Sequence, residues 1–238
     1  MKRYILSIVA LLGVAMTSCE QHTAESNGYG LLELSGIGVS VEEITRATAT
    51  DNFIVSVSKA SGEQVNSWTL GEMPQTVELR AGNYRVDVAS AASHAAVSRE
   101  GYFVGGTTFA ITAGQTTTPD AVTCTLESLK VSVEFEGEIL EALGSDCQTT
   151  VSLDQASITV AATDNAPIYF RPQDVRNTLK VVFEGTVDGA AERFTTEIAG
   201  VRVGQWRHIV IKMTYEDGER VLTASIAPWS QDEDIYVE

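Results

Sequence analysis

The clearest structural signal in the chain is the stretch Val77-Glu78-Leu79-Arg80-Ala81-Gly82-Asn83-Tyr84-Arg85-Val86-Asp87-Val88. On both sides of Gly82-Asn83, apolar and polar side chains alternate with the period of two that is typical of half-buried strands. Gly and Asn tolerate the positive φ angles that a tight two-residue turn requires. The stretch therefore predicts a β-hairpin whose second strand places Tyr84, Val86 and Val88 on one face.

The same period of two recurs on both sides of this hairpin in the first half of the chain. It predicts strands near residues 32–34, 37–41, 53–58, 65–68, 109–111 and 122–126. After Leu126 the inward phase slips by one residue, because the next apolar series begins at Leu129. Such a slip indicates a bulge or a crossing between domains near Glu127-Ser128.

The second half repeats the pattern of short strands and turns. Only residues 139–143 have helical spacing, and turns are predicted at Gly185, Asp188-Gly189, Gly204 and Asp217-Gly218. The predicted strands lie near residues 131–135, 150–153, 157–160, 179–183, 194–198, 209–215 and 221–226. Strands at spacings of about 8–12 residues are typical of β-sandwiches. We therefore predict an all-β chain of two tandem β-sandwich domains, residues 29–127 and 128–238, with a single larger sandwich as the alternative.

Residues 1–18 have the organisation of an export signal. Lys2 and Arg3 form a basic start, and the run from Tyr4 to Met16 is apolar apart from Ser7. A helix of this length rises about 20 Å, which is short of the roughly 30 Å hydrocarbon core of a bilayer. A cleaved signal peptide is therefore favoured over a permanent membrane span.

The end of this signal, Met16-Thr17-Ser18-Cys19, resembles a bacterial lipobox, with Met16 where Leu is commonest. The resemblance implies that the Cys19 thiol is acylated and becomes the mature N-terminus, so that two or three acyl chains hold the protein on a membrane. Glu20, in place of Asp, favours an outer-membrane or cell-surface address. Residues 19–28 are polar and predict a flexible tether. The alternative is a secreted protein with an incidental cysteine.

The composition restricts the partners that the chain is expected to have. It carries 16 Lys+Arg against 32 Asp+Glu, a formal net charge of −16. Because phosphate binding depends on clustered Lys and Arg, nucleic acid is not an expected partner. Cys124 and Cys147 could pair in an exported protein, but two buried or unpaired thiols are the preferred interpretation. Cys124 alternates with Val122 and Leu126 and is expected to face the core.

The sequence contains no recognisable catalytic or cofactor-binding motif. His22, His94 and His208 have no partner at metal-ligand spacing, and there is no His-Glu-x-x-His, Cys-x-x-Cys or Gly-x-Ser-x-Gly. The acidic residues 232–234 lack the glycine and ligand alternation of a calcium loop. We therefore expect no enzyme activity, no cofactor and no metal. A periplasmic hydrolase would need a cleft in which carboxylates or His208 converge, which a sequence cannot reveal.

The ordered set of motifs resembles the fimbrillin-like lipoproteins of Bacteroides and its relatives. More closely, it resembles uncharacterised lipoproteins of that group that are known only as a domain of unknown function. The motifs that carry the resemblance are the lipobox at Cys19, residues 53–68, Met73-Pro74, the stretch from Val77 to Tyr84, residues 101–105, 109–115 and 122–126, and Ala227-Pro228-Trp229. It implies two sandwiches of transthyretin-like or immunoglobulin-like topology, and it covers residues 29–127 better than the rest.

The resemblance also implies an assembly mechanism. In fimbrillins a protease cuts after an arginine behind the first strand, that strand leaves, and an extended segment of the next subunit fills the groove. Arg46 is the only base in the stretch from Glu42 to Thr50, so cleavage between Arg46 and Ala47 is the candidate processing event. An uncut linker arginine is the alternative.

These observations leave two functions. The first is a non-enzymatic cell-surface lipoprotein, a fimbrillin-like structural or adhesive subunit that assembles with itself or with pilus subunits by β-strand complementation. The second is a glycan-binding outer-membrane lipoprotein, which would require an exposed cluster of Trp68, Trp206 or Tyr102. Both would contact the membrane through the lipid anchor, and the sequence leaves the ligand and the oligomeric state open.

Overall fold

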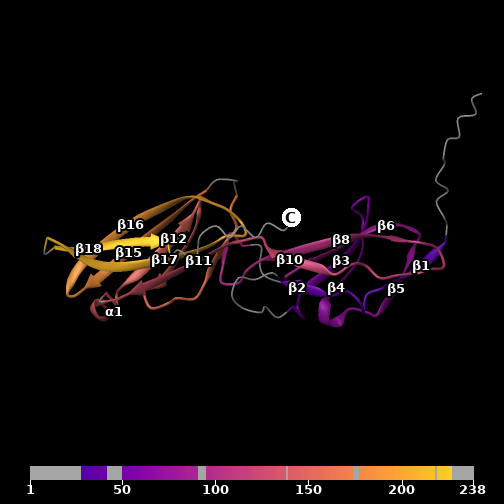
Figure 1. Ribbon diagram of the computed structural model, residues 1–238, viewed down its shortest axis with the longest axis horizontal. Helices are drawn as coiled ribbons and strands as arrows, with labels where there is room; N and C mark the ends of the chain where they lie inside the picture. Colours follow the sequence, from indigo (N-terminus) through magenta and orange to yellow (C-terminus); the bar gives the residue numbers. More distant parts are fainter. Residues whose placement is uncertain are drawn as a thin grey trace, which may run out of the picture.

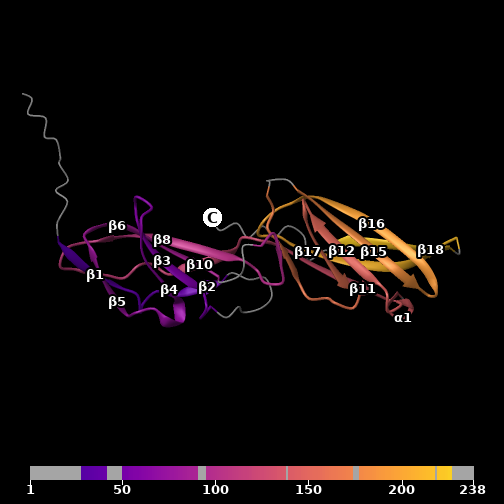
Figure 2. The same cartoon turned by 180° about the vertical axis from the view of Figure 1, so that it is seen from behind.

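A computed structural model describes residues 28–41, 50–90, 95–137, 139–173, 177–217 and 219–226. Nearly all elements in these ranges are strands, so the predicted all-β class is confirmed. Figure 1 shows two bodies arranged along the long axis, one formed by early strands and the other mainly by β11 and the strands that follow it. The view from behind in Figure 2 shows the same separation.

The first body is a sandwich of a six-stranded and a three-stranded sheet. The six strands have the order β2-β10-β8-β6-β3-β4, and the three have the order β5-β1-β9. The bounds are β1 (Tyr29–Glu33), β2 (Val39–Val41), β3 (Ile54–Lys59), β4 (Gln64–Thr69), β5 (Thr76–Arg80), β6 (Gly82–Ala89), β8 (Phe103–Ile111), β9 (Thr116–Thr117) and β10 (Val122–Leu126), with a 3-10 turn at Leu70–Glu72.

The second body is a sandwich of a five-stranded and a four-stranded sheet. Their orders are β18-β17-β11-β14-β7 and β13-β12-β15-β16. The bounds are β7 (Val97–Ser98), β11 (Leu129–Glu136), α1 (Ile139–Ala142), β12 (Gln148–Leu153), β13 (Ala156–Ala161), β14 (Ile168–Phe170), β15 (Asn177–Val187), β16 (Ala190–Val201), β17 (Trp206–Glu216) and β18 (Glu219–Ile226).

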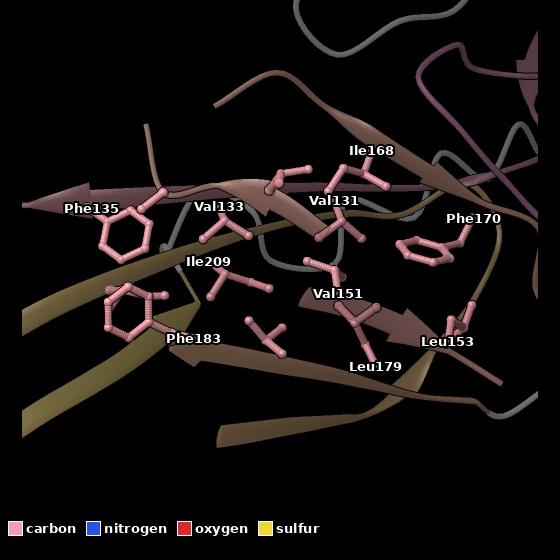
Figure 3. Packing of buried hydrophobic residues seen from close by; sticks show 14 of the residues in the cluster. Val131, Val133, Phe135, Val151, Leu153, Ile168, Phe170, Leu179, Phe183 and Ile209 are labelled. Carbon is pink, nitrogen blue, oxygen red and sulfur yellow. The ribbon is translucent and has the colours of Figure 1, made fainter. Parts of the chain in front are cut away.

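Each body encloses its own hydrophobic core. The first core is built from alternate residues of β1, β3, β5, β6, β8 and β10, and it includes Phe53, Val86 and Cys124. In the second core the rings of Phe135 and Phe183 are tilted against each other with centroids 5.4 Å apart. Figure 3 shows side chains of both sheets interdigitating there. The predicted alternation therefore identifies the residues that face inward.

The predicted hairpin around Gly82-Asn83 is wrong. β5 pairs with β1, whereas β6 pairs with β3 and β8, so the chain passes from one sheet of the sandwich to the other between Arg80 and Gly82. Asn83 is part of β6 and is not among the described residues with positive φ. The Tyr84 hydroxyl donates to Arg80 O at 2.9 Å across this corner. The error has a physical cause, because a corner between layers and a hairpin show the same side-chain alternation.

Several further features differ from the sequence expectation. Gly185 lies within β15 instead of a turn, where a Cβ would be 2.5 Å from Cys147 Cα, so the glycine permits close approach of two backbones. The strands β7, β9 and β14 were not predicted. β7 is the edge strand of a sheet in the second body, although it comes from the first half of the chain. The phase slip at Glu127-Ser128 is a change of sheet between β10 and β11, and the domain bounds 29–127 and 128–238 stay a prediction.

Candidate functional site

The candidate site is the N-terminal arm, defined here as residues 28–41, which contains β1, a tight turn and β2. The side chains of Leu32 and Leu34 are fully buried and that of Ile37 is 8% exposed, so the arm supplies part of the first core. On the opposite face of β1, Tyr29 and Leu31 are exposed. The arm is therefore an integral layer of the sandwich and not a loose extension.

β1 occupies the middle of the three-stranded sheet. It pairs antiparallel with β5 from Tyr29↔Arg80 to Glu33↔Thr76, and parallel with β9 through Leu31↔Thr116 and Leu32↔Thr117. Backbone hydrogen bonds also join the start of the arm to the chain on both of its sides. Ala81 N donates to Gly28 O and Gly114 N donates to Tyr29 O, each at 2.8 Å. Removing β1 would therefore leave two facing strand edges without partners.

Gly30 explains why the chain fits between these two strands. A Cβ at this position would be 2.9 Å from Gln115 O and closer still to Thr112 O, both of which are backbone atoms. Backbone atoms cannot rotate away as a flexible side chain does, so only glycine allows β1 to approach this closely. The hydrophobic pattern predicted the strand, but it gave no signal of this role for Gly30.

The arm then crosses to the other sheet. β2 pairs parallel with β10 through Val39↔Val122 and Val41↔Cys124, and Val122 N donates to Gly38 O at 2.8 Å. β2 is an edge strand of the six-stranded sheet. The predicted processing site, Arg46 and Ala47, and the predicted lipidation site, Cys19, lie outside the described residues.

His208 is part of a hydrogen-bonded chain on the outer face of β11 and β17. Trp206 Nε1 donates to Ser132 Oγ at 2.9 Å, Ser132 Oγ lies 2.7 Å from His208 Nδ1, and His208 Nε2 lies 3.0 Å from Glu134 Oε2. With the proton on Nε2, His208 accepts from Ser132 and donates to Glu134, so every group is satisfied. The parallel register of β11 and β17, which the sequence does not specify, brings these residues together.

The hydroxyl of this Ser-His-Glu chain is buried. Ser132 is 5% exposed and His208 is 6% exposed, whereas Glu134 lies at the solvent end with about half of its side chain exposed. A nucleophile must be reached by its substrate, and here the hydroxyl is the buried end of the chain. A hydrolase would require His208 to converge with other reactive groups in a cleft. Here His208 of β17 contacts Ser132 and Glu134 and so links β17 to β11.

The aromatic residues proposed as a glycan platform are partly covered by neighbouring side chains. Trp68, Tyr102 and Trp206 are all half-buried. Lys130 Nζ lies 4.7 Å from the centroid of the Trp206 ring, and Arg171 Cζ lies 5.7 Å from that of Tyr102. Trp68 packs against the first core. A sugar that stacks on the covered face of the Trp206 or Tyr102 ring would have to displace a cationic side chain.

The two cysteines of the described ranges are buried free thiols, one in each core, in agreement with the preferred interpretation of the sequence. Burial raises the pKa of Cys124 to about 11 and also raises that of Cys147. Within the described ranges, no group of three His, Cys, Asp or Glu side chains could hold a metal ion. In the same part of the chain, no helix has the length and apolar character needed to cross a membrane.

Comparison with solved structures finds similar folds at low sequence identity. A fimbrial assembly protein from Parabacteroides distasonis is 13% identical, covers 84% of this chain and 94% of its own, and has a TM-score of 0.46. The fimbrial anchor protein Mfa2 from Porphyromonas gingivalis is 10% identical, with 84% and 98% covered and a TM-score of 0.41. A candidate adhesin from Bacteroides ovatus is 11% identical, with 85% and 94% covered and a TM-score of 0.47.

Comparison with curated proteins gave no match. Comparison with protein families gave one match, which extends over residues 28–238 and is described as "Domain of unknown function (DUF4493)". This match confirms the resemblance to a family known only as a domain of unknown function. The chain therefore belongs to the DUF4493 family.

Proposed function

We propose that the protein is a cell-surface lipoprotein of fimbrillin type, a structural or adhesive subunit that assembles by β-strand complementation at the N-terminal arm. The observation that carries the proposal is the position of β1 between β5 and β9, with a single arginine in the segment that follows the arm. Cleavage after Arg46 separates the arm covalently from the rest of the sandwich. Departure of the arm then leaves a groove that only another extended segment can fill.

The energetics favour replacement of the arm over a permanently empty groove. Burying a Leu or Ile side chain contributes about 1.5–3 kcal/mol, so Leu32, Leu34 and Ile37 together contribute roughly 5–9 kcal/mol as an upper estimate. That range is comparable to the whole stability of a typical domain. The exposed edges of β5 and β9 add unpaired backbone groups. A donor strand that restores the apolar burial and the backbone hydrogen bonds would bind tightly and dissociate slowly.

The anchor in this proposal is the acylated Cys19, joined to the arm by the tether of residues 19–28. Before cleavage the protein is held on the outer membrane through this lipid. After cleavage the lipid stays with the arm, and the subunit is retained by its neighbours alone. The two states differ in the mature N-terminus, which is acylated Cys19 in the first and unmodified Ala47 in the second.

Mass spectrometry of the protein extracted from native membranes and from assembled surface structures tests the proposal. We expect acylated Cys19 in the membrane pool and Ala47 in the assembled pool. Arg46→Ala should abolish the Ala47 form and the oligomers together, whereas Arg46→Lys separates a requirement for arginine from one for positive charge. Chains that stay monomeric after complete cleavage at Arg46, with the assembly partners supplied, would contradict the proposal.

A further inference from the structure

We propose that β16 is a second interaction surface, independent of the arm, through which two copies of this chain pair edge to edge about a two-fold axis. β16 runs over twelve residues, Ala190–Val201, and it is the longest edge strand in the described part of the chain. In Figure 1 and Figure 2 it follows the outer margin of the second sandwich. Long edges are usually guarded by charged side chains, especially Lys, by Pro or by bulges. β16 contains no Lys or Pro, its register shift lies at the end that faces Asn177 and Thr178, and its charges can pair with those of a second copy.

The hydrogen-bond phase identifies the backbone groups that face outward on this edge. Gly144 N donates to Thr186 O and Asp188 N donates to Ala142 O, each at 2.7 Å, so these residues of β15 and its turn point away from β16. Ala191 lies opposite Thr186. In an antiparallel pair, two opposite residues either both bond to each other or both point away, so the N–H and C=O of Ala191 point away from β15. The N–H and C=O groups of alternate residues therefore face outward, and their side chains are exposed: Ala191, Arg193, Thr195, Glu197 and Ala199.

The side-chain pattern on this edge is complementary to itself. When two copies run antiparallel with Thr195 opposite Thr195, Arg193 of each copy lies opposite Glu197 of the other, and Ala191 lies opposite Ala199. Shifting the register by two residues in either direction removes both Arg–Glu pairs. Phe194 and Thr196 also become cross-strand neighbours, a favourable aromatic and β-branched combination. The sequence of the strand thus favours a single antiparallel register.

Charges on β15 extend this complementarity across four strands. Lys180 lies opposite Glu197, and Glu184 lies opposite Arg193, whose Nε is 4.0 Å from Glu184 Oε2. In the paired register, one row of side chains crosses four strands. It holds Lys180 and Glu197 of one copy, followed by Arg193 and Glu184 of the other. Charge alternates at every step of this row, and the two-fold axis generates the row twice. Opposite charges on neighbouring strands are the stabilising arrangement, and like charges would be destabilising.

The paired sheet closes at two copies, because the same edge serves both partners and is used up in the contact. The net charge of −16 opposes association, but at physiological ionic strength charges further apart than about 8 Å are largely screened. The local Arg–Glu pairs therefore dominate over the long-range repulsion. The product is an eight-stranded sheet in the order β13-β12-β15-β16-β16-β15-β12-β13.

Charge exchange tests this pairing in the full chain, purified in detergent at physiological ionic strength and measured by sedimentation velocity. We expect a reversible dimer for the native sequence. Arg193→Glu places a carboxylate opposite Glu197 in both cross-strand pairs, and Glu197→Arg places a guanidinium opposite Arg193 in both, so each single variant should dimerise at least about tenfold more weakly. The double variant R193E/E197R has the native net charge and restores opposite charges between the copies. Within each copy it places like charges opposite Glu184 and Lys180 of β15, so it should recover most of the affinity that the single variants lose.

A backbone variant gives an independent test. Thr195→Pro removes an N–H that faces away from β15, so the fold should be retained, as judged by thermal unfolding, while the dimer is lost. A native chain that is monomeric at all concentrations, single variants that associate as the native chain does, or oligomers larger than two would each overturn the proposal. Loss of Arg46 cleavage does not affect this result, so failure of the proposed function and failure of this pairing are distinguishable.

Discussion

The guanidinium Nη2 of Arg99 lies 2.6 Å from Oδ2 of Asp164, and the two residues come from different halves of the chain. Arg99 Nη1 also donates to Ala166 O at 2.8 Å. Arg99 directly follows β7, whose Val97 pairs with Phe170 of β14. The ion pair therefore fastens a segment of the first half to the edge of a sheet in the second body.

Replacing Arg99 should loosen this attachment without unfolding either core. Arg99→Ala should cost about 1 kcal/mol or less in global stability, because both side chains are about a third exposed. Local opening should increase, and hydrogen exchange at the amide of Ser98, which faces Tyr169 of β14, should become faster. Lys212→Ala, which breaks an exposed ion pair with Glu136 inside one body, is the control. Unchanged exchange at β7 in Arg99→Ala would refute the role of the pair.

The fit of the N-terminal arm should depend on Gly30. Gly30→Ala forces a Cβ against the backbone oxygens of Thr112 and Gln115, so we expect a loss of about 1–3 kcal/mol, concentrated in β1, β5 and β9. Gly38→Ala is the matched control on the same arm, because its Cβ would make an ordinary contact of 3.5 Å with Ala121 Cβ. Chemical denaturation measures both variants. Equal stabilities for the two would show that β1 does not need the close approach.

The loop before β12 should respond to acid through Asp146. Hydrogen bonds from the Thr186 hydroxyl, at 2.8 Å, and from Thr186 N hold the pKa of Asp146 below its usual value. Because the folded pKa is below the unfolded value of about 3.9, the stabilisation is present above that pH and is lost as the pH falls through the folded pKa.

Two variants of Thr186 separate the contributions to this pKa. Thr186→Val removes the hydroxyl and keeps N–H, so the pKa of Asp146 should rise toward its usual value. Thr186→Ser retains both donors and should leave it low. Carboxyl chemical shifts followed by NMR during a pH titration give the result directly. Identical titration of Asp146 in the two variants would exclude the hydroxyl as the main cause.

The buried thiols should be protected in the folded protein. Cys124, with its pKa raised to about 11, and Cys147, whose Sγ lies 3.0 Å from Thr186 O, should react with a thiol reagent at pH 8 only after unfolding. Unfolding in urea should release two reactive thiols. A third thiol that reacts at once in the protein from native membranes would be Cys19 and would contradict its acylation. Cys19→Ser identifies that signal.

The pattern of the sequence by itself determined which residues face inward. Alternation with a period of two identified Val86 and Val88, and the phase slip at Glu127-Ser128 marked the change of sheet between β10 and β11. These features are local, because a side chain's direction along a strand depends only on its position in the chain. The short helix at α1 was likewise visible in its spacing.

Only the tertiary structure decided which strands became partners. Backbone N–H and C=O groups are the same in every strand, so the sequence could not show that β5 pairs with β1, that β7 joins the second body, or that Ser132 meets His208. The same limit applies to the candidate site, whose apolar residues were predicted but whose position between β5 and β9 was not. Pairing depends on long-range packing of whole layers, which no local pattern encodes.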